Sequence, residues 1–106
     1  MNLFIATLKT QTRYTESEAF QQAKNIHADY YKALIPQGKF LMSGPALTEA
    51  GEFDGGIFVF RVESREVAKG IMAHDPLVQA GFSNYSLMEF NPILKHPALE
   101  AIFRIG

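Results

Sequence analysis

Two residues with acid–base side chains stand apart from their surroundings in this sequence. His27 lies within an apolar helical pattern, and Asp75 lies in the stretch IMAHDPLVQAG (71–81), where a proline and a glycine interrupt the chain. A carboxylate that is hydrogen-bonded to an imidazole selects the ring nitrogen that carries the hydrogen, and it stabilises the protonated ring. If the fold brings the two side chains together, they predict general acid–base chemistry.

Both residues also have a structural interpretation. A histidine on an apolar stripe is often a satisfied core residue, and aspartate before proline is common in turns, where its carboxylate accepts hydrogen bonds from nearby backbone amides. The predicted helices that carry or precede His27 and Asp75 lie on the same face of the predicted sheet. That placement allows a contact, but the sequence leaves the two interpretations open.

The tripeptide SGP (43–45) ends a predicted strand and is the candidate for substrate binding. Gly44 permits close approach of the backbone, and the Ser43 hydroxyl can donate a hydrogen bond to a ligand. A bend at the end of a strand is the alternative explanation. Four aromatic residues can line a pocket or fill the core equally well: Tyr30, Tyr31, Phe82 and Tyr85.

The sequence predicts neither a metal nor another cofactor. His74, in the last turn of a predicted helix, and His96, in KHPALE, are interpreted as structural or surface residues, and no H-x-x-x-H spacing is present. The chain contains no cysteine. This excludes disulfides, thiol catalysis, iron–sulfur clusters and cysteine zinc sites.

Length and composition indicate one cytoplasmic globular domain. The chain has 106 residues, 47% of them hydrophobic, and a formal net charge of −1. No basic cluster favours nucleic acid or a membrane surface, and no apolar run is long enough to span a bilayer. The segment DGGIFVFRV (54–62) loosely resembles an RNA-binding strand, but its basic surroundings are missing.

Hydrophobic periodicity predicts the elements that must position these residues. Strands are expected at 2–9, 39–45, 56–62 and 82–90, helices from an N-cap at Thr15 to before Pro36 and from an N-cap at Ser64 to 74, and a loop at 46–56. This βαββαβ order predicts a ferredoxin-like α+β sandwich, in which both helices cover one face of a four-stranded antiparallel sheet.

Both faces of the predicted sheet are apolar. The first strand presents Phe4, Ala6 and Leu8 to one face and Leu3 and Ile5 to the other, and the third strand alternates in the same way. Two helices cover only one face, so the second would be a large exposed apolar patch. We therefore predict a homodimer through the sheet faces.

Four segments in order make the chain similar to YciI-like (YCII-related) proteins. They are KNIHADYY, GKFLMSGP, FDGGIFVF and AHDPLVQAGFSNYSLMEFNP, and the resemblance covers roughly residues 1–95. It implies a ferredoxin-like fold of the dimeric α+β barrel type, dimeric through its sheets, with a pocket that contains a His–Asp pair. By position, that pair is His27 and Asp75, with Ser43 and Gly44 near the pocket.

The sequence departs from better-known members of this family. Lys24 stands where an arginine is often found, the loop between the second and third strands is short, and residues 96–106 form an additional tail after a domain at 1–95. A lysine is a point charge rather than a planar fork, which weakens any anion-binding role at that position.

Together these observations predict a small enzyme that isomerises or eliminates from a small organic molecule without a cofactor. His27 is the general acid or base, and Asp75 orients it. Two alternatives remain open. One is a non-catalytic ligand-binding or accessory interaction module, and the other is an oxygenase of the dimeric α+β barrel kind.

Overall fold

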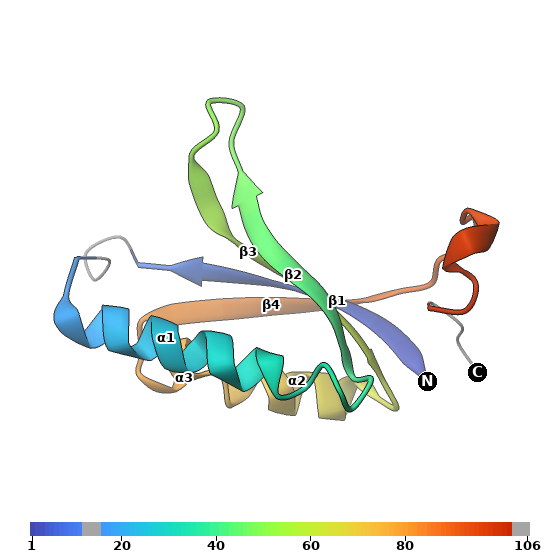
Figure 1. Ribbon diagram of the computed structural model, residues 1–106, viewed down its shortest axis with the longest axis horizontal. Coiled ribbons are helices and arrows are strands. Elements are labelled where there is room, and N and C mark those ends of the chain that lie inside the picture. The colour runs from blue at the N-terminus through green and yellow to red at the C-terminus, as the bar shows by residue number, and fades with distance from the viewer. Residues whose placement is uncertain (12–15, 103–106) are drawn as a thin grey trace.

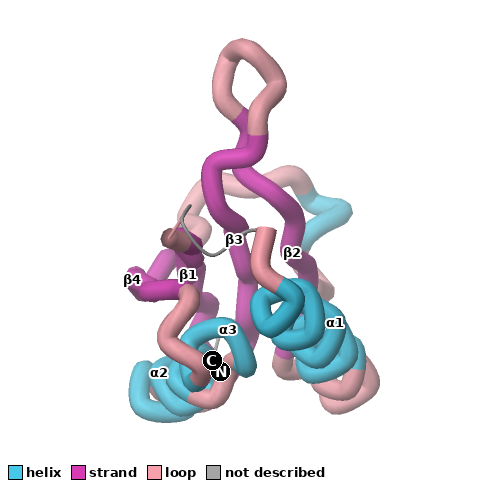
Figure 2. The backbone as a smooth tube through the Cα atoms, turned by 90° about the vertical axis from the view of Figure 1, so that its left-hand side faces the viewer, coloured by secondary structure: helices cyan, strands magenta, loops and turns pink. Residues whose placement is uncertain are grey.

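The computed structural model describes residues 1–11 and 16–102. Its elements are β1 (Asn2–Thr10), α1 (Glu18–Lys32), β2 (Phe40–Leu47), β3 (Phe53–Val62), α2 (Arg65–Ala73), α3 (Pro76–Gln79), β4 (Ser83–Phe90) and a 3-10 turn at Pro97–Leu99. The strands form one antiparallel sheet in the order β2-β3-β1-β4, and the helices lie on one side of it (Figures 1 and 2). The predicted ferredoxin-like α+β architecture is confirmed.

Within the described ranges, no helix combines the length and apolar character needed to cross a membrane.

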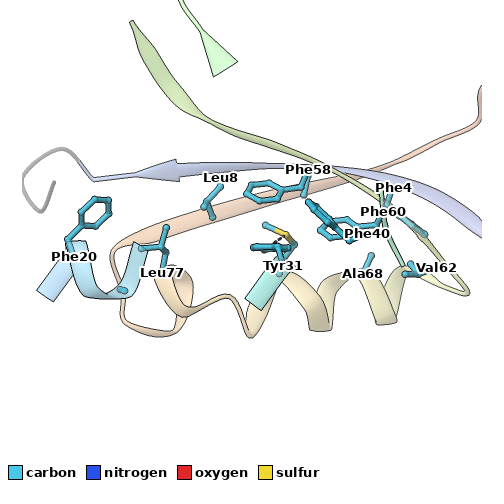
Figure 3. Packing of buried hydrophobic residues seen from close by; sticks show 13 residues of the cluster. Phe4, Leu8, Phe20, Tyr31, Phe40, Phe58, Phe60, Val62, Ala68 and Leu77 are labelled. Atoms are coloured by element: carbon cyan, nitrogen blue, oxygen red, sulfur yellow. Dashed lines mark hydrogen bonds between the residues drawn. The ribbon is translucent and has the colours of Figure 1, made fainter. Parts of the chain in front are cut away.

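The main core lies between the sheet and the helices. Alternate residues of β1 and β3 point toward the helices, where they meet the buried faces of α1 and α2 (Figure 3). The fully buried side chains of this layer include Phe4, Phe60, Val62 and Met72. Burial of this apolar layer, at roughly 25 cal/mol per Å² removed from water, holds α1 and α2 against the same sheet face.

The first helix begins two residues later than predicted. Its N-cap is Ser17, whose hydroxyl accepts a hydrogen bond from the Phe20 amide at 3.1 Å, so the predicted cap at Thr15 is wrong; Thr15 itself lies outside the described residues. Both residues are of capping type, and their spacing alone does not choose between them. The second cap is confirmed, because Ser64 accepts from the Val67 amide at 3.2 Å.

The segment predicted as a loop at 46–56 is in large part a hairpin arm. Leu47 of β2 pairs with Phe53 of β3, and a turn closed by the Gly51 amide on the Thr48 carbonyl at 2.9 Å joins them. Gly51 has a φ of +83°, which glycine adopts readily. The arm projects from the rest of the sheet (Figure 1). The side-chain pattern does not predict it, because backbone pairing continues through polar and glycine residues.

The sheet face opposite the helices carries an apolar row that crosses all four strands. Strand register aligns Met42, Val59, Ile5 and Met88 in that order. Val59 is buried, whereas Met42 is 53% and Met88 57% exposed. The prediction that both sheet faces are apolar is therefore confirmed for the subunit, and the outer part of this row remains accessible.

Candidate active site

His27 is held on the inner face of α1 by aromatic contacts. Ala23 and Tyr31, one turn before and after it, are both buried, and the imidazole itself is 19% exposed. The ring meets Tyr31 edge-on at a centroid distance of 5.0 Å and Phe58 at 5.8 Å. These contacts restrict the orientation of the imidazole while leaving part of it accessible.

Asp75 is the N-cap of the short helix α3. Its carboxylate accepts a hydrogen bond from the Leu77 amide at 2.8 Å, and Pro76 occupies the first helical turn, where its missing N–H is no loss. Gly81, with a φ of +82°, then turns the chain toward β4. The turn interpretation of Asp75 is therefore correct, and it explains why the residue precedes a proline.

The same carboxylate also reaches the histidine. Nδ1 of His27 lies 2.9 Å from Oδ1 and 2.8 Å from Oδ2 of Asp75, across a separation of 48 residues. Because an ionised carboxylate only accepts hydrogen bonds, Nδ1 carries the hydrogen and Nε2 is the ring nitrogen left for other partners. The two interpretations of Asp75 are thus compatible, since one side chain fulfils both.

A third donor to the carboxylate is Tyr31. Its hydroxyl donates to Oδ2 of Asp75 at 2.7 Å, and Asp75 is fully buried. Burial, reinforced by the Asp75 carboxylate, raises the pKa of Tyr31 far above its ordinary value. Burial followed by the same carboxylate also raises the pKa of Tyr30, whose hydroxyl donates to the Ile71 carbonyl at 2.7 Å. With three donors around it, the buried carboxylate is compensated without a permanent cation.

Replacing Tyr31 with phenylalanine should lower the free energy of unfolding by about 1.5–3 kcal/mol near pH 7, the range for hydrogen bonds to charged groups. The folded protein retains the Tyr31 proton at a pH where the unfolded chain releases it, so this stabilisation is complete below about pH 10 and declines above it. Urea unfolding of both proteins at pH 7 and above pH 10 measures the effect. A difference that stays constant across that range would contradict the assigned role of the hydroxyl.

A cavity of about 410 Å³ opens beside this pair. His27 and Tyr31 of α1 and Ser43 of β2 are among the residues that line it, so Ser43 and the histidine lie on the same cavity. Gly44 is not part of the lining; it pairs with Ile57, whose side chain lies on the sheet face opposite the helices. A cavity of this size is within the range of small-molecule sites.

The other histidines lie apart from the pair. His74 is exposed and its Nδ1 lies 2.7 Å from the Gly70 carbonyl, and His96 is exposed and accepts a hydrogen bond from the Ala98 amide. In the part of the chain that the structure describes, no three side chains of histidine, cysteine, aspartate or glutamate are grouped so that they could hold a metal ion.

Two residues of the site have roles that the sequence pattern does not predict. Tyr31 is predicted only as a candidate wall of an aromatic pocket, although its place four residues after His27 puts both on one helix face, where it can donate to Asp75. Lys32, which also lines the cavity, belongs to no motif. Its position beside β2 depends on how α1 packs.

Solved structures with the same fold include a dehydrochlorinase, an isomerase and an oxygenase. A 5-chloro-2-hydroxyhydroquinone dehydrochlorinase from Burkholderia phenoliruptrix, in complex with 2,5-dihydroxybenzoquinone, is 20% identical with a TM-score of 0.58, covering 84% of this chain and 93% of that one. A muconolactone isomerase is 18% identical with a TM-score of 0.65, covering 91% of this chain and 92% of that one. SnoaB, a cofactor-independent oxygenase from Streptomyces nogalater, is 10% identical with a TM-score of 0.54, covering 90% of this chain and 95% of that one.

These likenesses show the shared α+β fold. The sequence matches no curated protein. A family model described as the YCII-related domain matches residues 3–91, and so spans most of the chain. This protein therefore belongs to the family of YCII-related domain proteins.

Proposed function

We propose that this protein is a small-molecule enzyme that transfers protons with His27 and uses no cofactor. The observation that carries the proposal is the contact of Nδ1 with both carboxylate oxygens of Asp75, at 2.9 and 2.8 Å, beside a cavity lined by the same histidine. Two of the structural neighbours, a dehydrochlorinase and an isomerase, name an elimination and an isomerisation. Both reaction classes begin or end with proton transfer.

In the proposed mechanism, Nε2 of His27 removes a proton from an acidic C–H bond of the substrate. The electron pair moves into the substrate, while the imidazolium that forms is stabilised by Asp75. Isomerisation is completed when the ring returns the proton to a different atom, and elimination is completed when a leaving group departs with its electron pair. The Ser43 hydroxyl, on the same cavity, donates a hydrogen bond to a developing oxyanion, an interaction worth about 3 kcal/mol when preorganised.

Deuterium exchange tests this proposal for any substrate with an acidic C–H bond, whatever product is formed. Small carbonyl and hydroxylated ring compounds are incubated with the protein in D₂O, and mass spectrometry detects deuterium incorporated at carbon. We expect at least one compound to exchange, isomerise or lose a leaving group faster than in buffer. Binding without exchange or turnover across the whole set would favour a ligand-binding module, and consumption of oxygen would favour an oxygenase.

We also propose that two copies pair through the sheet face that the helices leave uncovered. The apolar row that crosses this face ends in Met42 and Met88, both more than half exposed. A second copy would cover this row and remove it from water.

Replacing Met88 with lysine is expected to shift the protein from dimer to monomer, because the charge would be buried unpaired in the interface. Sedimentation velocity measures the change. Ile26→Lys is the matched control, since Ile26 is 58% exposed but lies on α1, away from this face. A monomeric wild-type protein, or a Met88→Lys variant that stays dimeric, would contradict the proposed interface.

A further inference from the structure

The cavity beside His27 has an unusual balance of charge. Lys32 contributes the one permanent charge among the residues that line it, and no carboxylate is among them. Asp75 is fully buried behind the imidazole and is already bound by three donors. A ligand in this cavity therefore meets a cation and a histidine, with no anion to compete for them.

Lys32 has no ion-pair partner within residues 1–11 and 16–102. Its place in the last turn of α1 suits the helix dipole, which explains why a cation is tolerated there. The dipole does not account for Lys32 being among the residues that line a cavity together with residues of β2. An ammonium group that is free to move at the edge of an apolar cavity can accept an anionic group without first breaking a salt bridge.

The rest of the cavity is apolar. Its wall includes Ile35, Phe40 and Leu41, and the Tyr31 ring lies 5.2 Å from the Phe40 ring, centroid to centroid. Aromatic and aliphatic surfaces of this kind favour a flat ring. The cavity thus combines an apolar wall with the Ser43 hydroxyl and the Lys32 cation, while the hydroxyl of Tyr31, which also lines it, donates to Asp75.

We infer that this cavity selects small planar ring compounds that carry a negatively charged oxygen group, a carboxylate or a phenolate, and that Lys32 determines this selectivity. The inference rests on the proposed function only in assuming that a reaction takes place in this cavity. The binding preference itself does not depend on it. Electrostatic attraction at a partly exposed site is modest, so we expect a preference of about fivefold over a neutral ligand of the same shape.

A second cavity provides an internal comparison. It lies between α1 and α3, has a volume of about 620 Å³, and is lined by Gln22, Ile26 and His74 but by no lysine or arginine. The two cavities differ in charge, because only the cavity beside His27 has a permanent cation in its lining. Chemical shifts at Ser43 and at Gln22 therefore report the two cavities separately.

Benzoate and benzamide, which differ in charge but hardly in shape, are the probes. Each is titrated at low ionic strength against the full chain, and NMR follows the shifts around Ser43 and Gln22. We expect benzoate to bind near Ser43 about five times more tightly than benzamide, and this preference to disappear in Lys32→Gln but to persist in Lys32→Arg. Lys24→Gln is the matched control, because Lys24 is an exposed lysine of the same helix outside the cavity.

Equal affinity for benzoate and benzamide, a preference that survives in Lys32→Gln, or binding centred on Gln22 would each overturn the inference. The experiments can reject this inference and the proposed function independently of each other. An anion preference without deuterium exchange on any compound would retain the binding role of Lys32 and reject the enzyme. Exchange restricted to neutral compounds would retain the enzyme and reject the role of Lys32.

Discussion

Replacing His27 with glutamine is expected to lower the rate of deuterium exchange into a responsive compound by about two to four orders of magnitude, the contribution usual for a positioned general acid or base. The glutamine amide can still donate a hydrogen bond to the buried Asp75 carboxylate, so the fold should survive. What is lost is Nε2, the basic ring nitrogen that the contact of Nδ1 with Asp75 leaves available. The exchange rate, measured by mass spectrometry with circular dichroism as a check on folding, gives the result.

His74→Gln is the matched control for this prediction. It makes the same substitution at an exposed histidine whose Nδ1 lies 2.7 Å from the Gly70 carbonyl, outside the cavity beside His27. We expect its exchange rate to equal that of the wild type. If His27→Gln exchanged as fast as His74→Gln, His27 would have no part in proton transfer, and the proposed mechanism would have to be abandoned.

The second large effect is expected at Asp75, where both stability and rate should fall. Asp75→Ala leaves the Leu77 amide, the Tyr31 hydroxyl and the imidazole without their acceptor in a fully buried site. Unsatisfied buried donors of this kind lower the free energy of unfolding by about 3–5 kcal/mol in total. Urea unfolding measures the loss, and Asp54→Asn, at an exposed carboxylate paired with Lys9, should change stability by less than about 1 kcal/mol.

Asp75→Asn separates the positioning role from the structural one. Its amide oxygen can still accept from Leu77, but its NH₂ group would face Nδ1 of His27. The hydrogen of the ring is then expected to move to Nε2, which removes the free base from the cavity. Because the same carboxylate also caps α3, we expect stability to fall by about 1–3 kcal/mol, and the exchange rate by about 100-fold or more.

The nitrogen-15 shifts of His27 distinguish these two roles. In the wild type they should report hydrogen on Nδ1, and in Asp75→Asn hydrogen on Nε2. A variant that loses stability but keeps both the exchange rate and the Nδ1 tautomer would show that Asp75 only holds the fold together.

Local signals in the sequence are sufficient for the element order and for part of the site. The cap at Ser64 is predictable because capping depends on residues within one turn, and β3 is predictable because its apolar run is continuous. Local signals are not sufficient for the start of the first helix or for the extended hairpin. Thr15 and Ser17 are both capping residues, and the extended hairpin depends on backbone pairing that leaves little trace in the side chains.

The acid–base types of His27 and Asp75 are visible in the sequence, whereas their contact is decided by tertiary structure. A hydrogen bond across 48 residues exists only because α1 and α3 pack against each other on one sheet face. That packing also places Tyr31 on the carboxylate and Lys32 on the cavity, and it leaves Gly44 outside the lining. Residue type determines which chemistry is available, but distances between remote side chains are set by how the apolar faces of the helices and the sheet are buried together.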